Sequence, residues 1–253
     1  MSMTTKRIKV ITPIITEGLR DLADLRALEH PGLRIAQTLL KEGPSSIESA
    51  FEEMLAAPGV VAAALQAQAE GFDAVIVDCF ADPGLQAARE LLDIPVFGPG
   101  ECSMHAAAML GLRFSIVTVL PAVVPMLTEL AQRYGVADKL SSIRVIDIPV
   151  LALHGDPQAL QKAMGEQACK AVLEDGADAI VLGCTGFLGC ANVVSAELNR
   201  VGLNGVPVID PIPVTVHMAT ALCQSGLSHS KRGWPKPAKK PMAGFADLQA
   251  QLG

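Results

Sequence analysis

Two segments of the chain share one pattern, in which an apolar run ends at a cysteine. The first covers residues 73–80 (DAVIVDCF) and the second covers residues 178–185 (DAIVLGCT). Continuous apolar runs of this length are typical of parallel strands that are buried on both faces of a sheet. An acidic, glycine-bearing stretch precedes each run, as expected at the end of a helix. The repeated pattern predicts two related halves, each with a cysteine where a buried strand ends.

Strand-like and helix-like segments alternate along both halves. In the first half, the pattern predicts strands at 6–13, 33–39, 73–79 and 94–97, and helices at 16–30, 45–70 and about 84–92. In the second half, it predicts strands at 113–119, 142–148, 178–184 and 206–209, and helices at 102–110, 121–134, 157–175 and about 191–198. Ser45 and Glu48 have capping-box spacing, so the long alanine-rich helix is expected to begin there and to break at Pro58.

The alternation and the repeat together predict an α/β protein with parallel sheets and right-handed crossovers. We expect two pseudo-symmetric flavodoxin-like lobes with the active site in the cleft between them. Lobe 1 is expected to combine residues 1–98 with residues 212–253, because a last helix near 211–226 returns to it. Lobe 2 is expected to cover residues 99–211. Because the carboxyl ends of strands face the ligand in open α/β sheets, both cysteines are expected at one shared site.

The composition is that of a globular protein whose core is built from aliphatic side chains. Hydrophobic residues make up 50% of the 253 residues, charged residues 18% and aromatic residues 4%, and the net charge of −6 argues against a nucleic-acid partner. The uncharged run at 179–196 is interrupted by glycine and polar residues, so no membrane helix is expected there. Residues 1–9 are polar, and none of the 6 cysteines stands in a CxxC pair. We therefore expect a cytoplasmic protein without a metal site.

Cys79 and Cys184 are the candidate catalytic residues. If a carbon acid lies between them, one thiolate can remove its α-proton while the other thiol donates a proton to the opposite face, which inverts a stereocentre without a cofactor. Both cysteines are expected at strand-to-helix turns, where free N–H groups can lower a thiol pKa and can hold a carboxylate or a developing enolate. Residues 80–84 and 185–189 are the predicted cradles.

For any single cysteine the alternative is a purely structural role, because free cysteine is commonly a small buried hydrophobic residue. We interpret Cys102, Cys169 and Cys223 in that way, since they fall within helical patterns. The equivalent positions of Cys79 and Cys184 in the two halves favour catalysis. Two carboxylates flank the first cysteine: Asp78 would be strongly desolvated and needs a partner, and Asp82 is expected to cap the helix that follows.

At these residues the chain resembles the Asp/Glu/hydantoin racemase family, and within it the branch of hydantoin and allantoin racemases. The matching motifs lie at 43–48 (GPSSIE), 79–85 (CFADPGL), 87–90 (AARE), 114–118 (FSIVT), 149–151 (PVL), 182–184 (LGC), 207–210 (PVID) and 230–233 (SKRG). The resemblance implies two lobes, no cofactor, a two-thiol racemisation and a homo-oligomer. It also implies that Cys79 and Cys184 are the acid/base pair.

The same resemblance implies the substrate-binding residues. Phe80 and Thr185 fall on positions whose backbone N–H groups hold the substrate, and Thr118 falls on a hydroxyl that lines the cleft. The remaining predicted contacts are Pro13, Ile14 and Gly186. Two departures stand out: Ile14 replaces an amide side chain of the branch, and Thr185 is more like the amino-acid racemases than the alanine that the branch usually has.

The sequence therefore predicts a cofactor-independent racemase of hydantoin-like or allantoin-like compounds, whose partner is a small molecule and neither nucleic acid nor a membrane. The alternative within the superfamily is another reaction, such as that of an amino-acid racemase or a maleate-type cis–trans isomerase. A third possibility is a non-catalytic protein that binds a small molecule between its two lobes.

Overall fold

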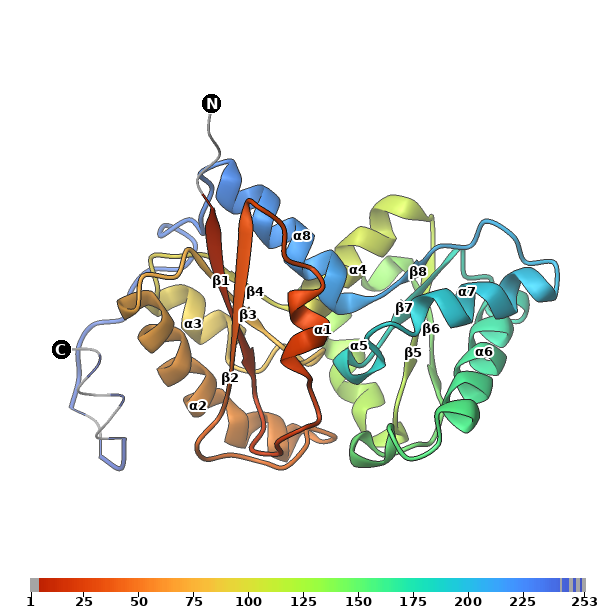
Figure 1. Ribbon diagram of the computed structural model, residues 1–253, viewed down its shortest axis with the longest axis horizontal. Coiled ribbons are helices and arrows are strands. Elements are labelled where there is room, and N and C mark those ends of the chain that lie inside the picture. Colours follow the sequence, from red (N-terminus) through yellow and green to blue (C-terminus); the bar gives the residue numbers. More distant parts are fainter. Residues whose placement is uncertain (1–4, 242, 246–247, 249–250, 252–253) are drawn as a thin grey trace.

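Two parallel four-stranded sheets form the two lobes of the protein (Figure 1). The computed structural model describes residues 5–241, 243–245, 248 and 251. The strand order is β2-β1-β3-β4 in the first sheet and β6-β5-β7-β8 in the second, so the halves repeat one topology. Every strand pair within the sheets is parallel. The predicted α/β fold of two similar flavodoxin-like lobes is confirmed.

The elements follow one another in the same alternating order in both lobes. Lobe 1 holds β1 (Lys6–Thr12), α1 (Leu22–Arg26), β2 (Leu33–Leu39), α2 (Ala50–Ala69), β3 (Ala74–Val77), α3 (Leu85–Leu91) and β4 (Val96–Phe97). Lobe 2 holds α4 (Pro99–Leu110), β5 (Phe114–Thr118), η1 (Pro121–Val123), α5 (Val124–Arg133), η2 (Ala137–Lys139), β6 (Leu140–Val145), η3 (Val150–Ala152), α6 (Pro157–Leu173), β7 (Ala179–Leu182), η4 (Thr185–Phe187), α7 (Ala191–Arg200) and β8 (Val208–Ile209). The chain continues into α8 (Pro211–Gln224).

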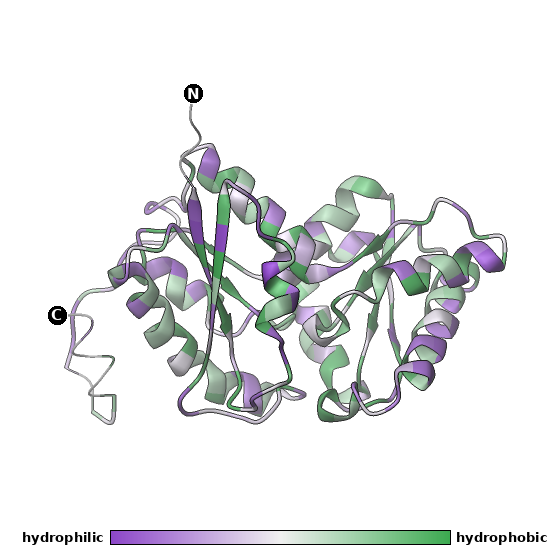
Figure 2. Ribbon diagram, viewed as in Figure 1, coloured by the Kyte–Doolittle hydropathy of each residue, from purple (hydrophilic) through white to green (hydrophobic). Residues whose placement is uncertain are grey.

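The first sheet is covered on both faces, and the alternation of side chains along its strands explains how. Val75 and Val77 of β3 pack with residues of α2 and α3 on one face. Ala74 and Ile76 pack on the other face with Ile212 and other residues of α8. Since successive side chains of a strand point to opposite faces, one short apolar run supplies both cores. Hydrophilic residues gather on the outer side of α6 and at the far end of α7, whereas β1 and β2 carry both hydrophobic and hydrophilic stretches (Figure 2).

The last helix connects the two lobes. After β8, at the edge of the second sheet, α8 runs along α4 and contacts β1 and β3 of the first sheet. The helix therefore contacts elements that belong to both halves of the chain. In Figure 1, α8 therefore lies on lobe 1 although it follows the last strand of lobe 2 in the sequence.

The α2 region differs from the prediction in two ways. The helix begins at Ala50, and the capping box is made by Ser49 and Glu52, four positions later than expected. The predicted start is wrong because Glu48 turns away and accepts a hydrogen bond from the backbone N–H of Val150 in lobe 2 at 2.5 Å. The predicted break at Pro58 is also wrong: α2 is continuous, since burial of its flanking turns against the first sheet outweighs the hydrogen bond that proline cannot make.

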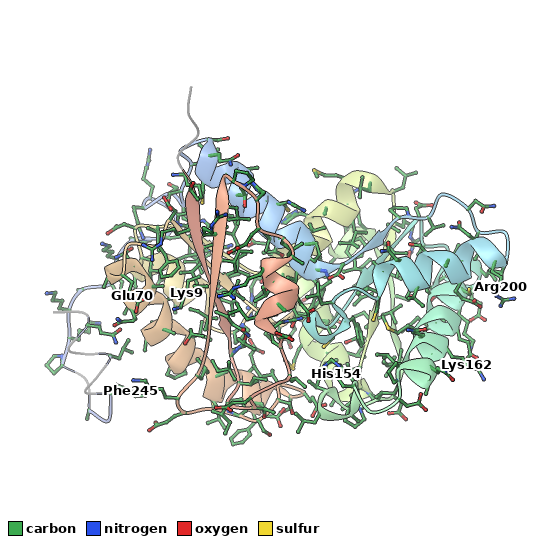
Figure 3. All side chains as sticks on the ribbon, viewed as in Figure 1. Lys9, Glu70, His154, Lys162, Arg200 and Phe245 are labelled. Atoms are coloured by element: carbon green, nitrogen blue, oxygen red, sulfur yellow. The ribbon has the colours of Figure 1, made fainter. Side chains whose placement is uncertain are left out.

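The predicted helix over residues 16–30 is mostly loop. Only α1 forms there, because the residues that precede it turn toward the second lobe. Figure 3 places His154 at the junction of the lobes, where its Nε2 lies 3.4 Å from the carbonyl oxygen of Leu19. Lys162 and Arg200, in contrast, lie on the outer helices of lobe 2. Among the described residues, no helix combines the length and the apolar character needed to cross a membrane.

Candidate active site

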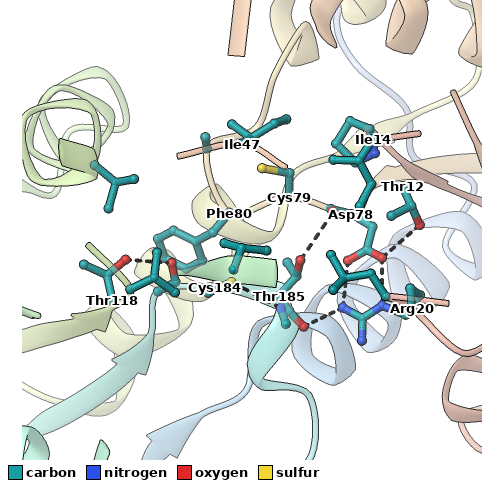
Figure 4. A pocket seen from close by; sticks show the side chains of 18 of the residues that line it. Thr12, Ile14, Arg20, Ile47, Asp78, Cys79, Phe80, Thr118, Cys184 and Thr185 are labelled. Carbon is teal, nitrogen blue, oxygen red and sulfur yellow. Dashed lines mark hydrogen bonds and ion pairs between the residues drawn. The ribbon is translucent and has the colours of Figure 1, made fainter. Parts of the chain in front are cut away.

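One cavity between the two sheets is lined by a cysteine from each lobe (Figure 4). Cys79 follows β3 and Cys184 follows β7, so both stand at the carboxyl end of the equivalent strand. The two predicted catalytic residues and the six predicted substrate contacts all line this cavity, whereas residues 82–84 and 187–189 of the predicted cradles do not. The catalytic residues and substrate contacts are Pro13, Ile14, Cys79, Phe80, Thr118, Cys184, Thr185 and Gly186.

The cysteine loops are held by backbone hydrogen bonds close to the sulfur atoms. In lobe 1, the N–H of Asp78 donates to the carbonyl of Ile11 at 2.8 Å, which keeps the end of β3 beside β1. In lobe 2, Cys184 is the N-cap of η4, and its Sγ accepts a hydrogen bond from the N–H of Gly186 at 3.3 Å. The expected contact between a thiol and a turn N–H is therefore present at Cys184.

Both thiols are harder to ionise than a free cysteine. Burial raises the pKa of Cys184 to about 11, while the Gly186 N–H and the Arg20 guanidinium act in the opposite direction. Burial also raises the pKa of Cys79 well above its ordinary value, and the neighbouring Cys184, Asp82 and Asp78 add to the rise. The lowered thiol pKa that strand-to-helix turns suggested is therefore wrong for this cavity, because desolvation outweighs the turn N–H groups.

Asp78 has the partner that its burial requires. The whole residue is 3% exposed, and its carboxylate accepts hydrogen bonds from Arg20 Nε at 2.9 Å and Arg20 Nη2 at 3.1 Å, and from Thr12 Oγ1 at 3.1 Å. The expectation that Asp78 is paired is confirmed. Sequence reasoning missed Arg20, since it lies in a segment that was predicted to be helical. The available signal was the buried carboxylate itself, which needs a cation nearby.

Thr118 and Thr185, the two threonines predicted from the sequence, both donate their hydroxyl hydrogen to backbone carbonyls. Thr118 Oγ1 donates to the carbonyl of Gly183 at 3.1 Å, inside lobe 2. Thr185 Oγ1 donates to the carbonyl of Asp78 at 3.3 Å, across the boundary between the lobes. Phe80 also crosses this boundary, because its ring packs into the core of lobe 2. The loop that carries Cys79 is thus embedded in the opposite lobe.

Asp82 does not cap the helix that follows it, and the prediction for this residue is wrong. The N-cap of α3 is Gly84, and the Asp82 carboxylate turns instead to the start of α4, where it accepts hydrogen bonds from the N–H groups of Gly100 at 3.0 Å and Glu101 at 2.9 Å. A Cβ atom on Gly98 or Gly100 would collide with this carboxylate. The sequence glycine-proline-glycine therefore makes room for an anchor between the Cys79 loop and α4.

The remaining walls of the cavity are apolar. Lobe 1 contributes Ile14 and Ile47, and lobe 2 contributes Val123, Met126, Leu127 and Val150. Glu101 pairs with Arg89 and is not a lining residue. In the part of the chain that the structure describes, no three His, Cys, Asp or Glu side chains gather closely enough to hold a metal ion. The polar chemistry of the cavity is concentrated at its cysteine loops.

Two thiols that reach one cavity from different lobes can act on opposite faces of a bound molecule. The two-lobed α/β fold is shared with solved racemase structures. The sequence profile described as Asp/Glu/Hydantoin racemase matches residues 12–219, and the chain belongs to this family.

Individual relatives and solved structures support the family assignment over nearly the whole chain. The chain is similar to a hydantoin racemase of Pseudomonas sp. (strain NS671), with 38% identity over 243 residues that cover 94% of each chain. Among solved structures, it resembles allantoin racemase from Klebsiella pneumoniae with a TM-score of 0.89 and 38% identity, covering 96% of this chain and 99% of that one. It also resembles allantoin racemase from Pseudomonas fluorescens, with a TM-score of 0.84 and 32% identity, covering 94% of this chain and all (100%) of that one.

Proposed function

We propose that this protein is a cofactor-independent racemase of hydantoin-type or allantoin-type compounds. The observation that carries the proposal is the cavity lined by Cys79 from one lobe and Cys184 from the other. A five-membered ureide with a hydrogen on the carbon next to its carbonyl is a carbon acid of suitable size and acidity. The relatives named hydantoin and allantoin racemase support this substrate class.

In the proposed reaction, the thiolate of one cysteine removes the proton from the stereogenic carbon, and the electron pair of that C–H bond moves into the adjacent carbonyl to form an enolate. The thiol of the other cysteine then donates its proton to the opposite face of the carbon, and the enolate collapses to the carbonyl. Each turnover exchanges the protonation states of the two sulfurs. Because burial raises the pKa of Cys184 to about 11, its thiolate is a strong base, although only a small fraction is ionised at neutral pH.

The other lining residues are proposed to bind the substrate. The backbone N–H groups of Phe80 and Thr185 hold the enolate oxygen or a ring carbonyl, which stabilises charge as it develops. Thr118 offers its hydroxyl oxygen to a ring N–H, since its own hydrogen is already donated to Gly183. Pro13, Ile14 and Gly186 complete the contact surface.

The substrates of an amino-acid racemase or a maleate-type isomerase carry carboxylates, and an unpaired cation in the cavity would favour them. Arg20, the cation that lines the cavity, is already paired with Asp78. The cavity therefore favours a neutral ureide over a dicarboxylate. A non-catalytic binding role gives no reason for a thiol from each lobe at one cavity.

Three further features belong to the proposal. The lobes divide at residues 98/99 and 211/212, which the start of α4 at Pro99 and the contacts of α8 with β1 and β3 support. The protein works in the cytoplasm, which its 6 free cysteines support. It acts as a homo-oligomer, which would cover exposed apolar side chains such as Phe51 (64% exposed) and Leu112 (81% exposed).

The test uses 5-substituted hydantoins and allantoin as single enantiomers in D₂O. Polarimetry follows inversion, and NMR follows loss of the α-proton. We expect Cys79→Ser and Cys184→Ser each to slow racemisation by roughly 10²–10⁴-fold. Each variant should retain exchange of the α-proton in one enantiomer only, and the two variants should prefer opposite enantiomers. Cys169→Ser, a half-buried cysteine of α6 outside the cavity, is the matched control. Racemisation that survives in both cavity variants would overturn the two-thiol mechanism.

A further inference from the structure

Among the residues that the structure describes, Arg20 is the charged side chain that forms hydrogen bonds with both cysteine loops. It extends from the loop between β1 and α1 into the boundary between the lobes. Its Nε and Nη2 donate to the two carboxylate oxygens of Asp78, the residue before Cys79. Its Nη2 also donates to the backbone carbonyl of Thr185, the residue after Cys184, at 2.5 Å. In Figure 4, dashed lines join Arg20 to Asp78 and to Thr185.

This chain of contacts is buried and supported from both sides. The side chains of Arg20 and Asp78 are 7% and 1% exposed. Thr185 Oγ1 donates back to the Asp78 carbonyl, so the two loops are joined twice. Thr12 Oγ1 donates to the Asp78 carboxylate and accepts from Gln37 Nε2 at 3.0 Å. A bidentate pair in such a setting has a defined geometry, because guanidinium and carboxylate are both planar.

The pair also has a direction relative to the two sulfurs. The carboxylate of Asp78 belongs to the residue beside Cys79, whereas the guanidinium of Arg20 reaches the loop of Cys184. The charged groups that face Cys184 are Arg20, Asp78 and Glu48, and Arg20 in turn faces Asp210. The groups that face Cys79 are the carboxylates of Asp78 and Asp82 and the thiol of Cys184. The charged groups that act on Cys184 thus include a cation, whereas those that act on Cys79 are carboxylates.

We propose that Arg20 is a positioning residue that holds the two cysteine loops together across the cavity and, with Asp78, favours the thiolate at Cys184 over that at Cys79. The two sulfurs are then unequal in the free enzyme, although they occupy equivalent places in the repeat. The free enzyme that binds a substrate then carries its thiolate mainly at Cys184. The kinetic consequence rests on the racemase function proposed above, but the difference between the thiols does not.

Racemisation rates alone cannot reveal which sulfur is ionised. Two enantiomers of a compound with one stereocentre have equal free energies, so kcat/KM must be the same in both directions. The test therefore labels the thiols of the free enzyme with iodoacetamide and counts the modified peptides of Cys79 and Cys184 by mass spectrometry. The labelling rate of each is measured in short pulses from pH 6 to pH 12.5, because the midpoint of the pH profile reports ionisation separately from access.

The variants are Arg20→Gln, Arg20→Lys and the control Arg144→Gln. Arg144 pairs with Asp175 in the same two-point geometry, at 2.6 and 2.7 Å, but on the outer side of lobe 2. In the wild type we expect Cys184 to have the lower labelling midpoint. Arg20→Gln should reduce the ratio of Cys184 to Cys79 labelling at pH 8 by about tenfold or more, since a neighbouring cation shifts a pKa by about one unit or more. It should also slow racemisation by roughly 100-fold.

Arg20→Lys separates charge from geometry. Lysine retains the positive charge but cannot donate to two carboxylate oxygens and a carbonyl in one plane. We expect this variant to keep the lower midpoint at Cys184 and yet to racemise roughly tenfold or more slowly, since small misplacements of catalytic groups are costly. Arg144→Gln should leave both readouts unchanged. If Arg20→Gln fails to fold, Arg20→Lys still tests the positioning role.

A folded Arg20→Gln with an unchanged Cys184 midpoint would overturn the charge part of the proposal. Wild-type racemisation in folded Arg20→Lys would overturn the positioning part. If the wild type racemises no ureide but its Cys184 midpoint still depends on Arg20, the proposed function fails while the assignment of the thiolate stands. The two failures are thus distinguishable.

Discussion

Tyr134 Oη donates a hydrogen bond to the carboxylate of Asp82 at 2.6 Å, and this contact joins the end of α5 to the loop that carries Cys79. The same carboxylate caps the start of α4. Two helices of lobe 2 are thereby tied to a loop of lobe 1 through one acidic side chain. The position of Cys79 consequently depends on residues that never touch the cavity.

Tyr134→Phe should destabilise the protein by about 1.5–3 kcal/mol, because a hydrogen bond to a buried charged group is lost while its apolar ring is kept. Urea denaturation monitored by circular dichroism measures this. Tyr134 also lowers the pKa of Asp82, so the variant should bind a proton there up to a higher pH. Stability equal to that of the wild type at pH 8 would show that the hydrogen bond contributes little.

The stability of the wild type should fall as the pH rises from about 4 to about 7 on account of Asp82. Burial raises the pKa of this carboxyl from 3.8 to about 7, so in this window the folded state holds a proton that the unfolded chain has released. The state that binds more protons is favoured at low pH, which gives the negative slope. Asp82→Asn removes the titration. The difference in urea midpoint between the two proteins across pH 4.5–7 isolates the contribution of this one group, and a constant difference would contradict the expectation.

Substrate preference should follow the apolar walls of the cavity. A hydantoin with an alkyl or aryl substituent buries it against side chains such as Val123, Met126 and Leu127. The ureido group of allantoin would leave polar atoms unpaired there, which costs about 1–3 kcal/mol, or roughly 5–150-fold in kcat/KM. Ile14→Asn places an amide in the same cavity and should raise the kcat/KM of allantoin relative to that of 5-benzylhydantoin. Equal kcat/KM values for both compounds in the wild type would refute this preference.

The racemisation rate should rise with pH over the range in which the protein is stable. Burial raises the pKa of both cavity thiols, to about 11 for Cys184, so near neutral pH the enzyme form with one thiolate is scarce. Its population grows tenfold for each pH unit below the pKa. We expect log kcat/KM to increase with a slope near one between pH 7 and pH 9.5. A plateau below pH 8 would mean that bound substrate or its approach ionises a thiol more readily than the free enzyme does.

The strands and the paired cysteines could be predicted because their signals are local. An apolar run such as that of β3 is readable in a few residues, and its copy at β7 shows the repeat directly. The contact between Arg20 and Thr185 spans 165 positions, and no local pattern reveals it. The sequence thus predicted that Asp78 has a partner but did not predict that this partner is Arg20.

Local signals failed where the two lobes meet. The spacing of Ser45 and Glu48 fits a capping box, but Glu48 forms a hydrogen bond with Val150 of lobe 2 instead. The leucine spacing over residues 16–30 suggests a long helix, but part of that segment is needed to bring Arg20 to the cysteine loops. Asp82 precedes α3 and yet caps α4. In each case a contact across the lobe boundary displaced the local preference.

The path of α8 sets an order of events during synthesis. Ile8 of β1 lies on one face of the first sheet, and this face is covered by Ile212, Val216 and Ala219 of α8. The ribosome releases those residues only after the whole of lobe 2 has been made. The lobe that is translated first therefore cannot complete its core until α8 has been translated, and until then it exposes an apolar sheet face that favours aggregation. Lobe 2, whose strands are contiguous in the sequence, is free to fold before lobe 1 does.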